Sequence, residues 1–171
     1  MKKIKDVNSS LEVKTGAGDY SQDKKNRMEL TLSWSSRIKK KAIAIGINPS
    51  KANDQRSDNT LTRLARFLDT YGFNEFLMLN IFESYSTDQN QIDKRSKTDF
   101  QKYRKHFAEV EAIFVVWGVN ENDYYEEKQK VLDILAEYRE KVYCIKKPNG
   151  RKPAHPARMG YACEVVKFYE A

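Results

Sequence analysis

The sequence is poor in the residues that build metal sites and disulfide frameworks. It has 171 residues, of which only two are Cys and two are His. Cys144 and Cys163 show neither a Cys-x-x-Cys motif nor a Cys/His ligand spacing, which argues against zinc, iron–sulfur clusters and a secreted disulfide framework. We therefore expect no metal, no cofactor and a reducing compartment.

Long apolar runs and the common nucleotide-binding loops are also missing. No stretch approaches the roughly 20 apolar residues of a membrane span, and residues 1–6 lead into no apolar segment typical of a signal peptide. No GxGxxG, GxxxxGK[ST] or Gly-x-Ser-x-Gly motif occurs, so dinucleotide, P-loop and serine-hydrolase sites have no support. We expect a cytoplasmic monomer with no membrane partner.

The residues that are present are typical of one folded domain. Apolar residues make up 40% and aromatic residues 12% of the chain, whereas disordered chains are poor in both. Residues 1–26 mix Lys, Ser, Gly and Asp without a clean period, which predicts a poorly ordered or loosely packed N-terminal segment. Residues 27–171 are predicted to form a single α/β domain.

Short apolar runs alternate with stretches of helical periodicity. Since the runs are apolar on both faces, they predict the central strands of a parallel sheet. They cover residues 42–47, 76–81, 112–117 and 142–145. Strict alternation predicts a half-buried flanking strand over residues 28–34, and helices are predicted over residues 61–68, 99–110, 124–138 and 159–169. This order predicts a three-layer α/β/α sandwich around a mostly parallel four-stranded sheet.

Polar or conformationally special residues follow each apolar run. Because ligands of open parallel sheets bind beyond the carboxyl ends of the strands, we expect these residues to meet at one site. The candidate substrate-binding residues are Gly46, Pro49, Ser50, Asn80, Phe82, Trp117 and Gly118, and the candidate catalytic residues are Asn48, Asp58 and His155.

Asn48 and Asp58 each allow two interpretations. Pro49 restricts the backbone of Asn48, whose amide can hold a water molecule or read a donor–acceptor edge, but cannot act as a general base. Alternatively, Asn48 bonds only its own backbone. Asp58 precedes a predicted helix, where it is either an N-cap or a carboxylate presented to a ligand; the two roles are compatible if it faces the cleft.

The positive charge of the chain is partly concentrated near its C-terminus. The formal net charge is +7, and residues 141–158 contain no acidic residue. This segment predicts an acidic partner, namely DNA, RNA or a phosphate-bearing small molecule, although a solvated basic loop is the alternative. The candidate nucleic-acid-binding residues in and beside it are Lys146, Lys147, Arg151, Lys152, Arg158 and Met159.

Several short motifs keep a characteristic order. They are Asn-Pro-Ser at 48–50, Asp-x-Thr at 58–60, Asn-x-Phe at 80–82, Trp-Gly at 117–118 and His-Pro at 155–156. With these motifs, the segment from Asn26 to Pro156 resembles a bacterial and phage family of unknown function. That resemblance implies no established activity.

The same motifs are more distantly similar to those of the uracil-DNA glycosylase superfamily. This resemblance implies a small parallel sheet between helices. It further implies that Asn48 positions an attacking water, Asn80 reads a flipped base and His155 stabilises the departing base anion. Met159 would then be an apolar wedge that enters the duplex.

Three functions follow from these patterns. The first is hydrolysis of an N-glycosidic bond of a nucleobase in DNA or a nucleotide, with Asn48 and Asp58 near the water. The second is a non-catalytic module that binds nucleic acid or nucleotide. The third is a small-molecule hydrolase or transferase that uses Asp58 as a base.

Overall fold

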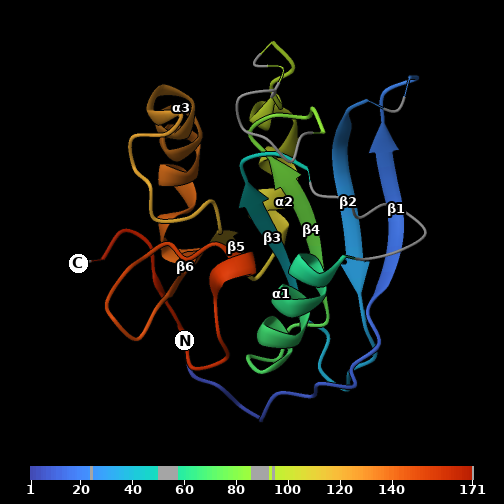
Figure 1. The fold of residues 1–171 in the computed structure, drawn as a ribbon, viewed down its shortest axis with the longest axis vertical. Coiled ribbons are helices and arrows are strands. Elements are labelled where there is room, and N and C mark those ends of the chain that lie inside the picture. Colours follow the sequence, from blue (N-terminus) through green and yellow to red (C-terminus); the bar gives the residue numbers. More distant parts are fainter. Residues whose placement is uncertain (24, 50–57, 86–92, 94, 171) are drawn as a thin grey trace.

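Seven strands in the described part of the chain pair into one mixed sheet in the order β1-β2-β4-β3-β5-β6-β7 (Figure 1). The computed structural model describes residues 1–23, 25–49, 58–85, 93 and 95–170. The strands are β1 (Lys14–Tyr20), β2 (Arg27–Ser33), β3 (Lys41–Gly46), β4 (Glu75–Asn80), β5 (Ala112–Val115), β6 (Val142–Lys146) and β7 (Glu164–Lys167).

Three α-helices and three 3-10 helices accompany the sheet in the described residues. The α-helices are α1 (Asn59–Asp69), α2 (Arg104–Glu109) and α3 (Tyr125–Leu135). The 3-10 helices are η2 (Phe100–Tyr103), η3 (Ala136–Lys141) and η4 (Pro156–Arg158). No helix among these residues is long and apolar enough to cross a lipid bilayer.

The inner strands β4, β3, β5 and β6 are parallel neighbours, and they correspond to the four apolar runs. They are apolar on both faces because helices cover both sides of the sheet. The buried face of α1 packs with Phe76 and Phe114, whereas α2 and α3 pack on the other side with Ile43 and Ile113. Figure 1 shows α1 in front of the sheet and α2 behind it. The predicted α/β class is therefore confirmed.

The prediction of a mostly parallel four-stranded sheet is wrong in strand number and in the edges. Antiparallel strands extend the sheet at both sides, with β2 and β1 beyond β4, and β7 beyond β6. These strands complete hydrogen-bonding edges that the parallel strands leave open. The predicted flanking strand at residues 28–34 is β2, which β1 covers in turn.

Strand β7 lies where the sequence analysis predicts a helix over residues 159–169. Helical spacing of Tyr161, Val165 and Phe168 suggested that helix, but the local Val165–Val166 pair favours a strand. In the structure, Val165 is buried and pairs with Ile145 of β6. Its N–H donates to the Tyr71 hydroxyl at 3.0 Å, which joins β7 to the chain after α1.

The first 26 residues contain β1, a strand that the sequence analysis does not predict. Most of its side chains are exposed or half-buried, so its sequence carries no clear apolar period. Upstream of β1, the Ile4 N–H donates to the Thr70 carbonyl at 2.8 Å. Lys5 Nζ lies 2.7 Å from the buried Asp69 carboxylate, which also accepts from the Trp34 indole N–H at 3.0 Å.

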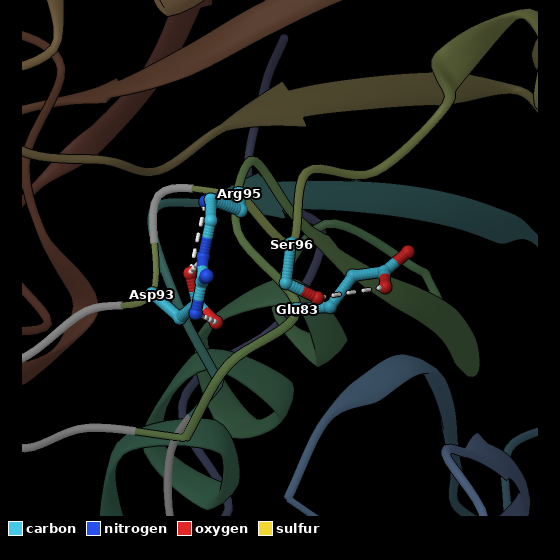
Figure 2. Close-up of polar contacts among 4 residues, drawn as sticks. All are labelled: Glu83, Asp93, Arg95 and Ser96. Atoms are coloured by element: carbon cyan, nitrogen blue, oxygen red, sulfur yellow. Dashed lines mark hydrogen bonds and ion pairs between the residues drawn. The ribbon is translucent and has the colours of Figure 1, made fainter.

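The segment that follows β4 is held by residues 95–98. Glu83 N–H donates to the Ser96 carbonyl at 2.9 Å, and the Ser96 hydroxyl lies 3.4 Å from Glu83 Oε2 (Figure 2). Arg95 in turn binds Asp93 through its guanidinium. The Glu83 carbonyl accepts from the Arg27 N–H at 2.8 Å, so this segment also fixes the start of β2.

Replacing Lys5 tests whether the N-terminal segment contributes to stability. Lys5→Met leaves the Asp69 carboxylate, whose side chain is 2% exposed, without its cationic partner. We expect the free energy of unfolding to fall by about 1–3 kcal/mol, between the values for exposed and buried ion pairs. Urea denaturation measures this change. Lys2→Met, at an exposed position nearby, is the control, and equal midpoints for the two variants would contradict the expectation.

Candidate functional site

A cleft lies at the carboxyl ends of β3, β4 and β5, and its volume is about 560 Å³. We call it the central cleft. Of the predicted site residues, it is lined by Gly46, Asn48, Pro49, Asp58, Asn80, Trp117 and His155. The central cleft therefore brings together the four side chains that are predicted to act on a water or a base. They come from four separate segments and are Asn48, Asp58, Asn80 and His155.

A second cleft of about 600 Å³ adjoins the first, and we call it the basic cleft. Both clefts are lined by Ile47, Trp117, His155 and Ala157, which therefore form the boundary between them. The cationic side chains that line the basic cleft are Lys128, Lys147, Arg151 and Arg158. Predicted residue Gly118 also lines it.

Asn80 ends β4 and places a carboxamide in the wall of the central cleft. The residue is 2% exposed, and its buried Oδ1 accepts no hydrogen bond from any residue that the structure describes. Gly46 lies opposite in the parallel register. A Cβ at Gly46 would come within 2.8 Å of Asn80 Oδ1 and 2.9 Å of Met78 Cε, so glycine makes room for the carboxamide.

Asn48 and Asp58 lie on the side of the central cleft formed by the end of β3 and the start of α1. Asn48 Nδ2 donates to the carbonyl of the adjacent Pro49 at 3.4 Å. Asp58 is the N-cap of α1, and its Oδ1 accepts from the Leu61 N–H at 2.8 Å. Capping and a position in the cleft wall are thus combined in one carboxylate.

His155 is held in a defined tautomer by its own loop. Its Nδ1 accepts from the Ala157 N–H at 3.1 Å, so the proton of the neutral ring is on Nε2. The residue is exposed, yet partial burial of its ring lowers its pKa, and the Arg158 charge lowers it further. The ring is thereby favoured as a neutral hydrogen-bond donor through Nε2.

Two neighbours fix the loop that carries His155. Gly118 has a φ of +94°, and a Cβ there would lie 3.5 Å from His155 Cβ, so the loop packs closely against a left-handed glycine. From α1, Arg63 Nη1 donates to the Ala157 carbonyl at 3.1 Å. Helix α1, whose N-cap is Asp58, therefore also anchors the His155 loop that lines the same cleft.

Sequence reasoning missed two buried cations that line the clefts. Arg27 is fully buried, lines the central cleft, and has its Cζ 5.8 Å from the Tyr85 ring centroid. Burial lowers its pKa. Lys128 is 4% exposed and lines the basic cleft. Its position on the apolar face of α3 was a usable signal, because lysine is almost never buried without a specific reason.

Several predicted residues lie away from the clefts. Phe82 is buried in the core, where its ring packs against Tyr124 at a centroid distance of 4.9 Å. Met159 is also buried, which leaves no exposed wedge at that position. Lys146 pairs with Glu164 at 3.7 Å, and Lys152 Nζ contacts the Glu170 carbonyl. Ser50 lies outside the described residues.

Comparison with known proteins shows the family of the chain. The model of a family described as "Protein of unknown function (DUF1643)" matches residues 27–157. The chain belongs to the DUF1643 family. The match runs from Arg27 to Ala157 and so includes each element that builds the central cleft. The comparisons found no matching curated protein and no matching solved structure.

The residues that line the central cleft offer a carboxylate, three carboxamides and an imidazole as reactive or recognising groups. Within the described ranges, no group of three or more His, Cys, Asp or Glu side chains is arranged to hold a metal ion. Cys144 is buried in the core, and burial raises the pKa of its thiol to about 11. The thiol is therefore a poor nucleophile at neutral pH.

Gly46→Ala tests the close approach between β3 and Asn80. We expect the added methyl group to displace the Asn80 carboxamide and to lower the free energy of unfolding by about 1–3 kcal/mol. Gly160→Ala is the matched control, because no atom lies within 4 Å of a Cβ at that position. Thermal unfolding and the amide NMR signal of Asn80 measure the effect; an unshifted Asn80 signal would contradict it.

The titration of His155 tests the electrostatics of the loop. We expect an NMR titration midpoint below the ordinary value of about 6.5, because burial and Arg158 both favour the neutral ring. Arg158→Gln removes a cation that opposes imidazolium formation and should raise the midpoint. Arg37→Gln, at an exposed position on the chain before β3, should not change it. A midpoint unaffected by Arg158→Gln would show that the charge does not reach the ring.

Proposed function

We propose that the chain hydrolyses the N-glycosidic bond between a nucleobase and its sugar, in a nucleotide or in DNA. The observation that carries this proposal is the buried Asn80 carboxamide, which shares one cleft with Asn48, Asp58 and His155. The order of the motifs supports this proposal, because it is similar to the order in the uracil-DNA glycosylase superfamily. A uracil-DNA glycosylase-like fold is part of the same proposal. Membership in DUF1643 leaves the reaction open.

Recognition of the base is assigned to Asn80. A carboxamide offers an acceptor oxygen and a donor NH₂ side by side, which complements the alternating edge of a nucleobase. A buried acceptor without a partner is costly, and a ligand that donates to it removes that cost. Trp117 and Met78 supply apolar surface in the same cleft for the faces of the base.

The reaction needs a placed water and stabilisation of two developing charges. The water oxygen attacks the anomeric carbon, the C–N bond breaks, and its electron pair leaves with the base. Asn48 is assigned to orient the water, while the Asp58 carboxylate stabilises the positive charge that develops on the sugar. His155 Nε2–H donates to the departing base anion. The water proton finally replaces the sugar on the base, which balances the hydrolysis.

The geometry bears differently on the two other candidate functions. Asp58 Oδ1 accepts the Leu61 N–H, so this carboxylate caps helix α1, and removing a proton from a substrate would compete with that role. This disfavours the hydrolase or transferase that depends on Asp58 as a base. The basic cleft favours a binding function, so a nucleotide-binding module without catalysis is the second candidate.

Release of a free base tests the proposal. The protein is incubated with nucleosides, nucleotides, single strands, and duplexes containing uracil, hypoxanthine or a mismatch, and the products are separated by chromatography. We expect a base to be released from at least one class. His155→Ala should slow release by about 10²–10³-fold, the usual cost of losing a donor to a developing anion.

The second histidine provides the matched control. His106 is exposed on α2 and lies outside both clefts, so His106→Ala should release the base at the wild-type rate. Absence of release from every substrate class would refute the hydrolase. Ligand binding without release would then identify the binding module.

A further inference from the structure

The basic cleft brings together cations from three segments of the chain. Lys128 comes from α3, Lys147 and Arg151 flank a turn after β6, and Arg158 ends η4. The turn is closed by the Gly150 N–H, which donates to the Lys147 carbonyl at 2.9 Å, and by the Lys147 N–H, which donates to the Arg151 carbonyl at 2.8 Å. Folding, and not sequence proximity alone, thus concentrates positive charge here.

The surface cations of this cleft are not neutralised from within the described chain. The side chains of Lys147, Arg151 and Arg158 form no ion pair with any described residue. Among the residues lining the basic cleft, Asp123 supplies the one carboxylate, and its Oδ2 accepts from Asn120 Nδ2 at 2.6 Å. The cleft therefore has an excess of positive charge.

Lys128 is the independent observation that points to an anion. Its ammonium donates to the Asn120 carbonyl at 2.5 Å and lies 5.9 Å from the Trp117 ring centroid. No carboxylate of the described chain lies within ion-pair distance of it, although Asp123 and Glu121 act on it electrostatically. A buried ammonium with only these partners is costly, and an anion in the cleft would offset that cost.

The position of the basic cleft relates this anion to the proposed substrate. Trp117 and His155 line both clefts, so a ligand with its base beside Asn80 can extend past them toward Lys128. The buried position of Met159 removes the wedge with which a duplex base would be displaced. These two facts favour a ligand whose base is already unstacked.

We propose that the basic cleft binds a phosphate group of the ligand whose base occupies the central cleft, which makes the substrate a nucleoside phosphate. This inference rests on the proposed function for the identity of the base site. Lys128 is its buried contact, and Lys147, Arg151 and Arg158 surround the phosphate from the open side. The phosphate belongs either to a free nucleotide or to the backbone of a single strand.

Calorimetry with defined ligands tests the phosphate site and separates its two sources. The titrants are inorganic phosphate, the four common ribonucleosides, their 5′-monophosphates, and an oligonucleotide without terminal phosphates. We expect at least one monophosphate to bind about tenfold or more tightly than its nucleoside, with an affinity that falls as salt rises. Tighter binding of the oligonucleotide alone would assign the phosphate to a strand backbone. Equal affinities with and without phosphate would overturn the proposal.

Matched variants locate the phosphate. Lys128→Met keeps the length of the side chain and should weaken phosphate binding about tenfold or more, the usual effect of losing a charged hydrogen bond. Lys130→Met, exposed on the same helix, should not weaken it. Lys147→Gln should act like Lys128→Met, whereas its neighbour Lys146→Gln, outside the cleft, should not. Wild-type affinity in both Lys128→Met and Lys147→Gln would overturn the assignment.

The two proposals fail in different ways. Phosphate binding that depends on Lys128, without release of any base, would leave the phosphate site standing and reject the hydrolase. Release of bases from nucleosides and nucleotides at equal rates, without phosphate binding, would support the hydrolase and reject the phosphate site. Thermal unfolding of each variant checks that a loss of binding reflects the cleft and not the fold.

Discussion

The parallel register of β3 between β4 and β5 is the constraint on which the site depends. It places Gly46 opposite Asn80, and three loop N–H groups continue the pairing past the strand ends. Ile81 donates to the Gly46 carbonyl, Val116 to that of Ile45 and Phe82 to that of Ile47. Because these bonds fix where each strand ends, the side chains that follow the strands converge on the central cleft, although they lie far apart in the sequence.

Helix α1 joins the parts of the molecule that this register does not reach. Its first turn is capped by Asp58, its middle holds the His155 loop through Arg63, and Arg66 donates to the Leu11 carbonyl. Beyond its last residue, Tyr71 reaches β7. The Asp58 carboxylate, the His155 loop, the N-terminal segment and the C-terminal strand are thus all held by α1 or by the residues next to it.

The sequence predicted the inner sheet well because continuous apolar runs have few structural alternatives. One rule, that parallel strands end at one edge, predicted a shared position for Asn48, Asn80 and His155. Asp58 was placed beside them by a different signal, its position at the start of a predicted helix. It did not predict β1, whose side chains are largely exposed, or the strand at residues 164–167, where a helical spacing competed with local Val-Val preference. Whether a short segment near a terminus forms a strand or a helix depends on the neighbouring elements against which it packs.

Individual side chains were harder to assign than segments. Phe82 and Met159 follow motifs at the site, yet both are buried, since an apolar side chain turns toward whichever core is nearest. Arg27 and Lys128 were overlooked for the opposite reason, because cations are expected in solvent. The basic run divides in the same way: three of its members reach the basic cleft, while Lys146 and Lys152 bind other partners.

The outer strand β1 is irregular in a way that matters for the behaviour of the protein at high concentration. Its pairing with β2 shifts register between Thr15 and Gly18 and again between Asp19 and Tyr20. Such irregularities bend a strand away from the flat geometry that another chain needs in order to add to an open sheet edge. At the opposite edge, β7 has only four residues. Both edges are therefore poor templates for aggregation, because neither one offers a long and flat strand with which another chain could pair.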